Sequence, residues 1–313
     1  MTDQLTEEGL FKLLGNDTRM AILEALWADF DVEAYILGSQ DPMPFSTLRD
    51  AADVDDVGNF NYHLGQLEGQ FVQAVENDAG KGYSLSPLGY SVIHAIEGHT
   101  TFDDQSLGPT RLEDPCPFCD GQLEAEYERE IVTVRCLDCP AHGGGSLNRV
   151  RVPATQQVLD IHEVLDLSVL QLLSSFTAGR FGRCRSCHAA VDMSVLTAET
   201  HPEELEANRS EAVCRVQCEN CGAGGFGPLY EYALATPSVQ TFFSAHGLGP
   251  ADDLWRYRLE VLRRVEEAVL ATDPVIVAYT FEIDDERHRV HIEPSAAGLE
   301  ISSQPMPDTV NEN

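Results

Sequence analysis

Residues 116–139 read CPFCDGQLEAEYEREIVTVRCLDC, and this stretch decides how the middle of the chain folds. It begins and ends with a Cys-x-x-Cys pair, and sixteen residues separate the two pairs. A Cys-x-x-Cys turn supplies two thiolates with little strain, and a hairpin of this length brings two such turns together. The stretch therefore predicts a tetrahedral metal site built from Cys116, Cys119, Cys136 and Cys139.

A second set of Cys-x-x-Cys turns follows, with its thiols at Cys184, Cys187, Cys218 and Cys221. Thirty residues separate these two turns, so this second ribbon has a longer loop. In both sets four thiolates fill every position around a tetrahedral zinc ion and leave none for water, which is typical of structural zinc. We therefore predict two zinc ribbons, each holding one structural Zn²⁺ ion.

The ninth cysteine, Cys214, lies outside these pairs. It is either a substitute ligand or a buried thiol, and the apolar character of a free thiol favours the second interpretation. His142 and His188 lie beside the turns, where a surface position or a hydrogen bond to a ligand is favoured over ligation. A redox or metal response, through oxidation of thiolates or through Cys214, is the lesser alternative.

Acidic residues dominate the composition. The chain of 313 residues contains 52 Asp and Glu against 20 Lys and Arg, which gives a net charge of −32. Such a surface repels nucleic acid in dilute salt, but the composition also resembles that of proteins from halophilic archaea that accumulate KCl. At 1 M salt the Debye length is about 3 Å, so distant negative charge has little effect.

The sequence predicts a cytoplasmic protein with no membrane partner. No apolar run reaches the roughly 20 residues that span a membrane. The acidic start at residues 1–4 has no apolar signal region. A reducing compartment also favours metal sites over disulfides for regularly spaced cysteines.

Residues 5–98 contain no cysteine and show mostly helical periodicity. Two opening helices are expected, the second capped at Asn16, and an insert follows from about 28 to 44. Ser46 is expected to cap a short helix at 46–52, and a turn then leads into a longer helix.

That longer helix, about 57–68, is followed by an extended run at 71–76 and a return strand at 82–86. Pro87 is expected to open the last helix of this region. This order of elements predicts a winged helix-turn-helix. Opening helices are followed by a helix–turn–helix, a two-stranded wing and a closing helix.

In such a domain the second helix of the motif enters the major groove of DNA. Its exposed face is expected to carry polar side chains that pair with bases or reach phosphates: Asn59, Asn61, Tyr62, His63 and Gln66. Phe60, Leu64 and Leu67 have the spacing of inward-facing residues. Lys81 at the tip of the wing is expected to contact a phosphate or the minor groove, and Arg49 of the preceding helix is expected to contact the DNA backbone.

Three segments in this order resemble regulators of the ArsR type, in the form found in haloarchaea. They are LGNDTRMAIL at 14–23, FNYHLGQL at 60–67 and GYSLSPLG at 82–89. The resemblance covers about residues 5–98. It implies a transcriptional regulator that dimerises through the first and last helices of this domain and binds a palindromic site in double-stranded DNA. Control of a promoter, with contacts to the transcription machinery, would follow.

The charge of this domain opposes that interpretation. Residues 1–100 contain 17 Asp and Glu against 4 Lys and Arg, whereas affinity for DNA comes largely from neutralised phosphates. Two outcomes stay open. Either DNA binding takes place in molar KCl, or the winged helix has become a protein-binding module and the chain is a zinc-ribbon adaptor.

The rest of the chain is predicted to complete an α+β protein. Two four-cysteine zinc ribbons with intervening helices, including one at about 154–176, precede a small β-rich C-terminal module. A hairpin is expected around 284–286, while 265–270 is compatible with helix or strand. The expected divisions are a winged helix (1–98), a linker (99–115), ribbon 1 (116–178), ribbon 2 (179–250), the C-terminal module (251–304) and a disordered tail (305–313).

The two ribbons also suggest an internal duplication, because Pro153 and Pro237, like His162 and His246, are 84 residues apart. Sequences typical of enzymes, such as a Walker loop, GxSxG or HExxH, do not occur, and we expect no catalytic activity. Arg180, Arg183 and Arg185 crowd the third Cys-x-x-Cys turn and form either a contact patch for DNA or a partner, or a solvated surface.

Overall fold

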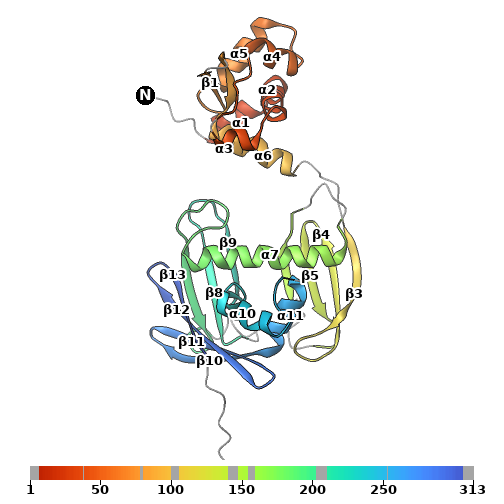
Figure 1. The fold of residues 1–313 in the computed structure, drawn as a ribbon, viewed down its shortest axis with the longest axis vertical. Coiled ribbons are helices and arrows are strands. Elements are labelled where there is room, and N and C mark those ends of the chain that lie inside the picture. Colours follow the sequence, from red (N-terminus) through yellow and green to blue (C-terminus); the bar gives the residue numbers. More distant parts are fainter. Residues whose placement is uncertain are drawn as a thin grey trace, which may run out of the picture. The chain divides into compact units, whose positions relative to one another are not determined.

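The computed structural model describes residues 7–37, 39–77, 80–99, 106–139, 147–153, 159–201, 210–251 and 253–305. The chain is a mixed α+β protein whose sheets are antiparallel. It forms two compact units, Met1–Phe102 (the N-terminal unit) and Asp103–Asn313 (the C-terminal unit), which are described separately (Figure 1). Of the tail expected at 305–313, Pro305 is the last residue of a strand, and 306–313 lie outside the described residues.

The N-terminal unit combines helices with one hairpin. Its elements are α1 (Glu7–Leu14), α2 (Asp17–Ala28), α3 (Val32–Leu37), α4 (Phe45–Ala51), α5 (Val57–Leu67), β1 (Val72–Asn77), β2 (Gly80–Leu85) and α6 (Pro87–His99). The order of helices and strands expected from the sequence is confirmed, and the insert at 28–44 contains the short helix α3.

Side-chain caps fix the starts of two of these helices. The Asn16 side chain accepts a hydrogen bond from the Arg19 amide at 3.1 Å, as expected, and Asp56 accepts one from the Asn59 amide at 2.7 Å. The expected cap at Ser46 is wrong. Helix α4 begins at Phe45 after Pro44, which makes no capping hydrogen bond with its side chain.

Two glycines let the hairpin and α6 pack closely. A Cβ atom on Gly82 would collide with the Met43 carbonyl, and one on Gly89 would collide with the Phe71 carbonyl. These contacts join β2 to the segment before α4 and α6 to the segment before β1. The core beneath them is formed by Leu13, Ile22, Leu23, Ala25, Leu26, Met43, Leu48, Ala52, Phe60, Leu64, Leu67, Phe71, Val72, Leu85 and Ile93.

The described residues of the C-terminal unit form three antiparallel sheets. The first is β3 (Leu107–Pro115), β4 (Gln122–Glu128), β5 (Ile131–Cys136) and β6 (Asn148–Arg151); the second is β7 (Asp192–Thr197), β8 (Ala212–Gln217) and β9 (Gly224–Pro228). The third, a β-rich C-terminal module, is β10 (Val265–Thr272), β11 (Val275–Ile283), β12 (Glu286–Ser295) and β13 (Gly298–Pro305). Residues 107–115 were expected in a linker, but they pair with β4.

Two-residue turns set the register of two hairpins. Arg129 and Glu130 between β4 and β5 have φ of 50° and 61°, and Asp284 and Asp285 between β11 and β12 have φ of 48° and 68°. Positive φ at both central residues is the geometry whose twist matches that of paired strands. The hairpin expected around 284–286 is confirmed, and the ambiguous segment 265–270 is a strand.

The long helix α7 (Ile161–Arg180) begins later than the sequence suggested. The Asp160 side chain accepts hydrogen bonds from the His162 and Glu163 amides, and the Asp160 amide donates one to the Glu163 carboxylate, so a capping box sets the start. Residues 154–158 of the expected helix lie outside the described residues. The shorter helices of this unit are α9 (Glu231–Leu234), α10 (Pro237–Ala245) and α11 (Leu254–Arg264).

Helix α7 contributes to the two larger hydrophobic cores of the C-terminal unit. Near its start, Val164, Leu165 and Val169 are buried against the first sheet. Near its end, Phe176 packs against the core of the second and third sheets, and Leu173 packs against both cores. Figure 1 shows the helix running from the side of β4 and β5 to the side of β8 and β9.

Helix α11 also contributes side chains to the same two cores. Trp255 and Leu259 belong to the core of the first sheet, whereas Tyr257 and Val261 belong to the other core. The Trp255 amide donates to Asp166 of α7 at 2.9 Å. The segments that the sequence divides into two ribbons and a C-terminal module therefore form one compact unit.

A buried ion pair joins α11 to α9. Arg258 donates to Glu231 at 2.5 Å, with both side chains almost completely buried, and also donates to the Leu147 carbonyl at 3.3 Å. Two charges removed from water need such close pairing, because their desolvation costs several kcal/mol per ion.

The duplication suggested by the sequence holds for the ribbons and not for the helices. Both ribbons have the same order of elements. A Cys-x-x-Cys turn leads into two paired strands, and a second such turn then leads into a third strand. His162, however, lies in the first turn of α7, whereas His246 follows the last residue of α10. The shared spacing of the histidines therefore has no counterpart in the structure.

Because Leu165 is fully buried and Leu170 of the same helix is 51% exposed, the pair tests the role of α7. We expect Leu165→Ala to lower the free energy of unfolding of the C-terminal unit by about 2–5 kcal/mol. Leu170→Ala should change it by less than about 0.5 kcal/mol. Denaturant unfolding, followed by the fluorescence of Trp255 in a Trp27→Phe background, measures both; equal effects would contradict the assignment of the buried face.

Candidate metal centres and nucleic-acid interface

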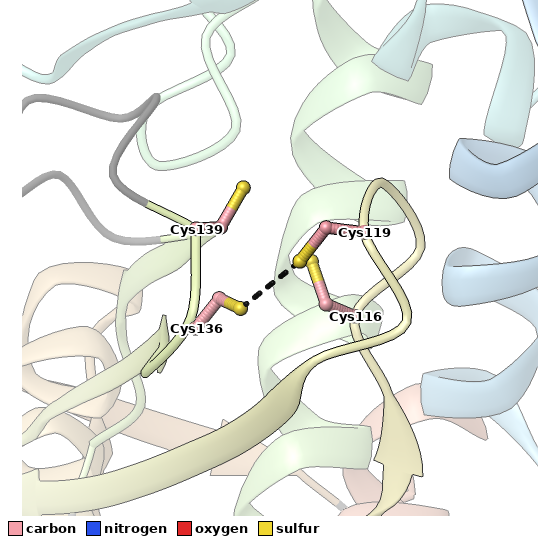
Figure 2. Close-up of side chains that lie close together, drawn as sticks. All are labelled: Cys116, Cys119, Cys136 and Cys139. Atoms are coloured by element: carbon pink, nitrogen blue, oxygen red, sulfur yellow. Dashed lines mark hydrogen bonds between the residues drawn. The ribbon is translucent and has the colours of Figure 1, made fainter.

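The structure brings each predicted set of four cysteines together. The four sulfur atoms of each set lie within 4.8 Å of one another. Figure 2 shows Cys116 and Cys119 on one loop facing Cys136 and Cys139 on another. The two clusters, cluster 1 and cluster 2, are formed by Cys116, Cys119, Cys136 and Cys139, and by Cys184, Cys187, Cys218 and Cys221.

Three of the four turns share one backbone pattern. The amide of the first cysteine donates to the carbonyl five residues on, at 2.8 Å in each case: Cys116 to Gly121, Cys184 to Ala189 and Cys218 to Ala223. The residue after the second cysteine has positive φ: Asp120 (56°), His188 (58°) and Gly222 (72°). This closed turn holds both sulfur atoms of a pair on the same side.

Further contacts fix the positions of the Cys-x-x-Cys turns within the C-terminal unit. In cluster 1, the Gln122 amide donates to the Asp138 carboxylate at 2.8 Å, which joins the two turns. Arg263 of α11 pairs with Asp120 at 2.6 Å. In cluster 2, the end of α7 leads directly into the first turn, because the Arg183 amide donates to the Ala178 carbonyl at 3.0 Å.

The sulfur spacing fits a tetrahedral metal ion. Metal–sulfur bonds of about 2.3 Å place the sulfurs of a tetrahedron about 3.8 Å apart, whereas a disulfide bond is about 2.0 Å long. The Cys119–Cys136 distance is 3.5 Å, and in cluster 2 Cys184–Cys221 is 3.6 Å and Cys187–Cys218 is 3.5 Å. Both clusters are therefore compatible with metal binding and not with disulfides.

Backbone amides also favour thiolate at several positions. The amides of Cys187 and Ser186 lower the pKa of Cys184 to about 6. The Gly121 amide lowers the pKa of Cys119, and the Ala189 amide lowers that of Cys187. Burial raises the pKa of Cys116 to about 12, so this thiol needs the charge of a metal ion to lose its proton.

Cys214 belongs to neither cluster. It lies on β8, is 3% exposed and donates from Sγ to the Tyr232 hydroxyl at 3.6 Å. Burial raises its pKa to about 11, as expected for a buried thiol. His188 occupies the positive-φ position of a turn and is not part of the cluster, and His142 lies outside the described residues.

The residues predicted to contact DNA lie mainly on the exposed side of α5. Asn59, Asn61, Tyr62 and Gln66 are exposed, whereas Phe60, Leu64 and Leu67 are buried. His63 departs from the expectation because it is half-buried, and its Nδ1 has no hydrogen-bond partner among the described residues. Burial, and secondarily the charge of Arg19, lowers the pKa of His63.

Both cations predicted to contact DNA form ion pairs within the chain. Lys81 lies 3.1 Å from Glu76, its partner in the β1–β2 register, and Arg49 lies 2.6 Å from Asp50. Such exposed pairs are weak, with a median value of about 0–1 kcal/mol, so a phosphate can compete for either cation.

The comparisons with known proteins identify domains without an assigned function. The family described as domain of unknown function DUF7351 matches residues 113–297, and the one described as domain of unknown function DUF7347 matches residues 7–96. No curated protein and no solved structure matches the chain. Among the described residues, no helix is both long and apolar enough to cross a membrane.

Metal content gives a direct test of the two clusters. We expect the purified chain to hold two metal ions, and Cys136→Ser and Cys187→Ser to hold one each, because a serine hydroxyl replaces a thiolate poorly. Cys214→Ser is the matched control and should retain two. Elemental analysis by mass spectrometry measures the stoichiometry. Loss of an ion from Cys214→Ser, or two ions in either cluster variant, would contradict the ligand assignment.

Proposed function

We propose that this chain, which belongs to the DUF7351 family, is a cytoplasmic transcription regulator that binds specific sequences in double-stranded DNA. Its N-terminal unit would be a winged helix-turn-helix of the ArsR type. The observation that carries the proposal is the division of α5 into a buried apolar face and an exposed face with Asn59, Asn61 and Gln66. Amide side chains pair bidentately with adenine in the major groove.

The elements around α5 support this role. Helix α4 ends shortly before the Asp56 cap of α5, as the first helix of a helix-turn-helix would. The β1–β2 hairpin follows α5 and carries Lys81, in the position of a wing. The side chain of Tyr62, 62% exposed, stands on the same helix as the amides and can reach a base or a phosphate.

A symmetrical site requires two copies of the unit. The resemblance to ArsR-type regulators implies a homodimer formed through α1 and α6. The Phe11 side chain on α1 is 77% exposed, and an apolar ring in that position favours burial against another surface. The expected DNA site is a palindrome whose half-sites lie about one helical turn, or roughly 34 Å, apart.

The two four-cysteine clusters would hold zinc in a structural role. Four thiolates satisfy tetrahedral Zn²⁺ and leave no position open for a water molecule or substrate. The bound ions would lock the Cys-x-x-Cys turns together at one end of each ribbon, where the small sheets offer few apolar contacts. The C-terminal unit would then be a rigid body available for contacts with the transcription machinery.

Discrimination between bases is the first test of this proposal. Selection from random DNA in about 2 M KCl should enrich one palindromic motif. Asn61→Ala should then weaken binding by roughly tenfold to a hundredfold, since a bidentate base contact contributes about 1–3 kcal/mol. Glu24→Gln, an exposed change on α2, is the control and should bind like the wild type in the same fluorescence anisotropy assay.

The result of the selection from random DNA also decides whether the partner of this unit is DNA or a protein. A protein-binding adaptor is the second candidate, because Lys81 and Arg49, the two cations predicted to contact DNA, are each paired with a carboxylate that a phosphate would have to displace. If the folded, metal-loaded protein enriches no motif, the DNA proposal is wrong. If Asn61→Ala binds the enriched motif like the wild type, then α5 is not the helix that contacts the bases.

The dependence of DNA affinity on salt should be unusually shallow. Each neutralised phosphate adds about −0.9 to the slope of log K against log [salt]. The N-terminal unit offers few cations, and two of them are already paired. We expect a slope between about 0 and −2 for each protomer, measured by anisotropy from about 0.5 to 3 M KCl. A slope near about −6 per protomer would mean that other basic residues dominate the interface.

A further inference from the structure

A cavity of about 330 Å³ lies within the C-terminal unit, between β6, α7, the first turn of cluster 2 and the β8–β9 pair. Apolar side chains form much of its wall, including Leu172 and Phe176 of α7, Val216 of β8 and Tyr232 of α9. This volume is within the range of pockets that bury small organic molecules. Cys184 of cluster 2 lines one side of the cavity, and the other three cysteines of that cluster are not among its lining residues.

Four arginines line the same cavity: Arg149 and Arg151 from β6, and Arg183 and Arg185 from the turn of cluster 2. Arg151 pairs with Glu130 at 2.6 Å. Arg185 donates to the Gln171 side chain at 3.1 Å and to the Ser175 hydroxyl at 3.2 Å. Both acceptors are uncharged and lie on α7, so they hold the guanidinium in place without neutralising it.

The other two arginines have no carboxylate partner within the described residues. Arg149 and Arg183 are exposed at the cavity, yet neither forms an ion pair there, in a chain with 52 acidic residues and 20 basic ones. Some exposed arginines of the same unit do pair with neighbouring carboxylates, as Arg287 does with Glu282 at 2.6 Å. Arg149 and Arg183 therefore bring two guanidinium groups without an ion pair to one cavity.

Glycines in β9 keep the cavity open. Gly225 pairs with Val216 and Gly227 pairs with Cys214 in the β8–β9 register. Paired residues point to the same face of a sheet, and all four line the cavity. A Cβ atom added to Gly225 would meet nothing within 4 Å. A larger residue at this position would fill the space where a ligand would lie.

From these observations we infer that the cavity binds a small organic anion in which a carboxylate or phosphate is attached to an apolar, ring-sized body. The guanidinium groups of Arg149, Arg183 and Arg185 would bind the oxyanion, because their planar donor pairs match carboxylate and phosphate oxygens. The wall formed by Phe176 and Val216 would contact the apolar body. This inference is independent of DNA binding, which concerns the other unit.

The aromatic sulfonate 8-anilinonaphthalene-1-sulfonate is a suitable probe, because it combines an oxyanion with rings and fluoresces when its rings leave water. We expect one saturable site on the full-length, metal-loaded protein. The Arg149→Gln/Arg183→Gln variant should weaken binding at least tenfold. Arg129→Gln/Arg287→Gln removes the same charge from two arginines that are ion-paired elsewhere, and it should leave the affinity unchanged.

A second variant tests the cavity without changing any charge. Gly225→Leu should abolish binding of the probe while metal content and unfolding stay as in the wild type. Unchanged probe binding in Gly225→Leu, or equal losses in the two double arginine variants, would overturn the proposal. So would the absence of a saturable site.

Competition distinguishes the two sources of the oxyanion. Benzoate carries a carboxylate on a ring, and adenosine monophosphate carries a phosphate on a ring-bearing nucleoside. Displacement of the probe by benzoate alone would assign a carboxylate ligand, and displacement by the nucleotide alone would assign a phosphate. Displacement by both would identify the oxyanion as the common feature recognised, and displacement by neither would contradict the proposal.

Discussion

The C-terminal unit depends on the burial of one helix in two cores. Among the described residues, each ribbon sheet has three or four short strands, and the apolar face of such a sheet must be buried against another element. Helix α7 is such an element for both, because Leu165 lies in one core and Phe176 packs against the other. The helix also ends at the first turn of cluster 2, so its position sets where two of the four sulfur atoms lie.

This arrangement divides the stabilisation of each ribbon between its two ends. At one end, four cysteines converge in a geometry that a tetrahedral metal ion would hold. Farther along the strands, apolar residues such as Val132 are buried in the same core as residues of α7 and α11. The cavity beside cluster 2 results from the same arrangement, because β6 of the first ribbon and β9 of the second both reach α7 there.

Local features of the structure could be predicted from the sequence, because residues close in the chain determine them. The two Cys-x-x-Cys pairs of each cluster were assigned from their spacing, and Asn16 was correctly assigned as a cap. The 284–286 hairpin was predicted from alternating residues around an acidic turn. The polar and apolar faces of α5 also follow from periodicity, although the half-buried position of His63 does not.

Features that join distant residues depend on how the elements pack, and local patterns do not predict them. Strand β3 was expected in a linker because its residues become a strand only by pairing with β4. The Arg258–Glu231 pair and the meeting of Arg149 with Arg183 depend on how α7 and α11 pack, which no local pattern encodes. Short-range hydrogen bonds and backbone angles are enough to set the Cys-x-x-Cys turns, the Asn16 cap and the 284–286 turn, so local patterns predict them. The shared cores and the cavity were decided by burial between residues far apart in the chain.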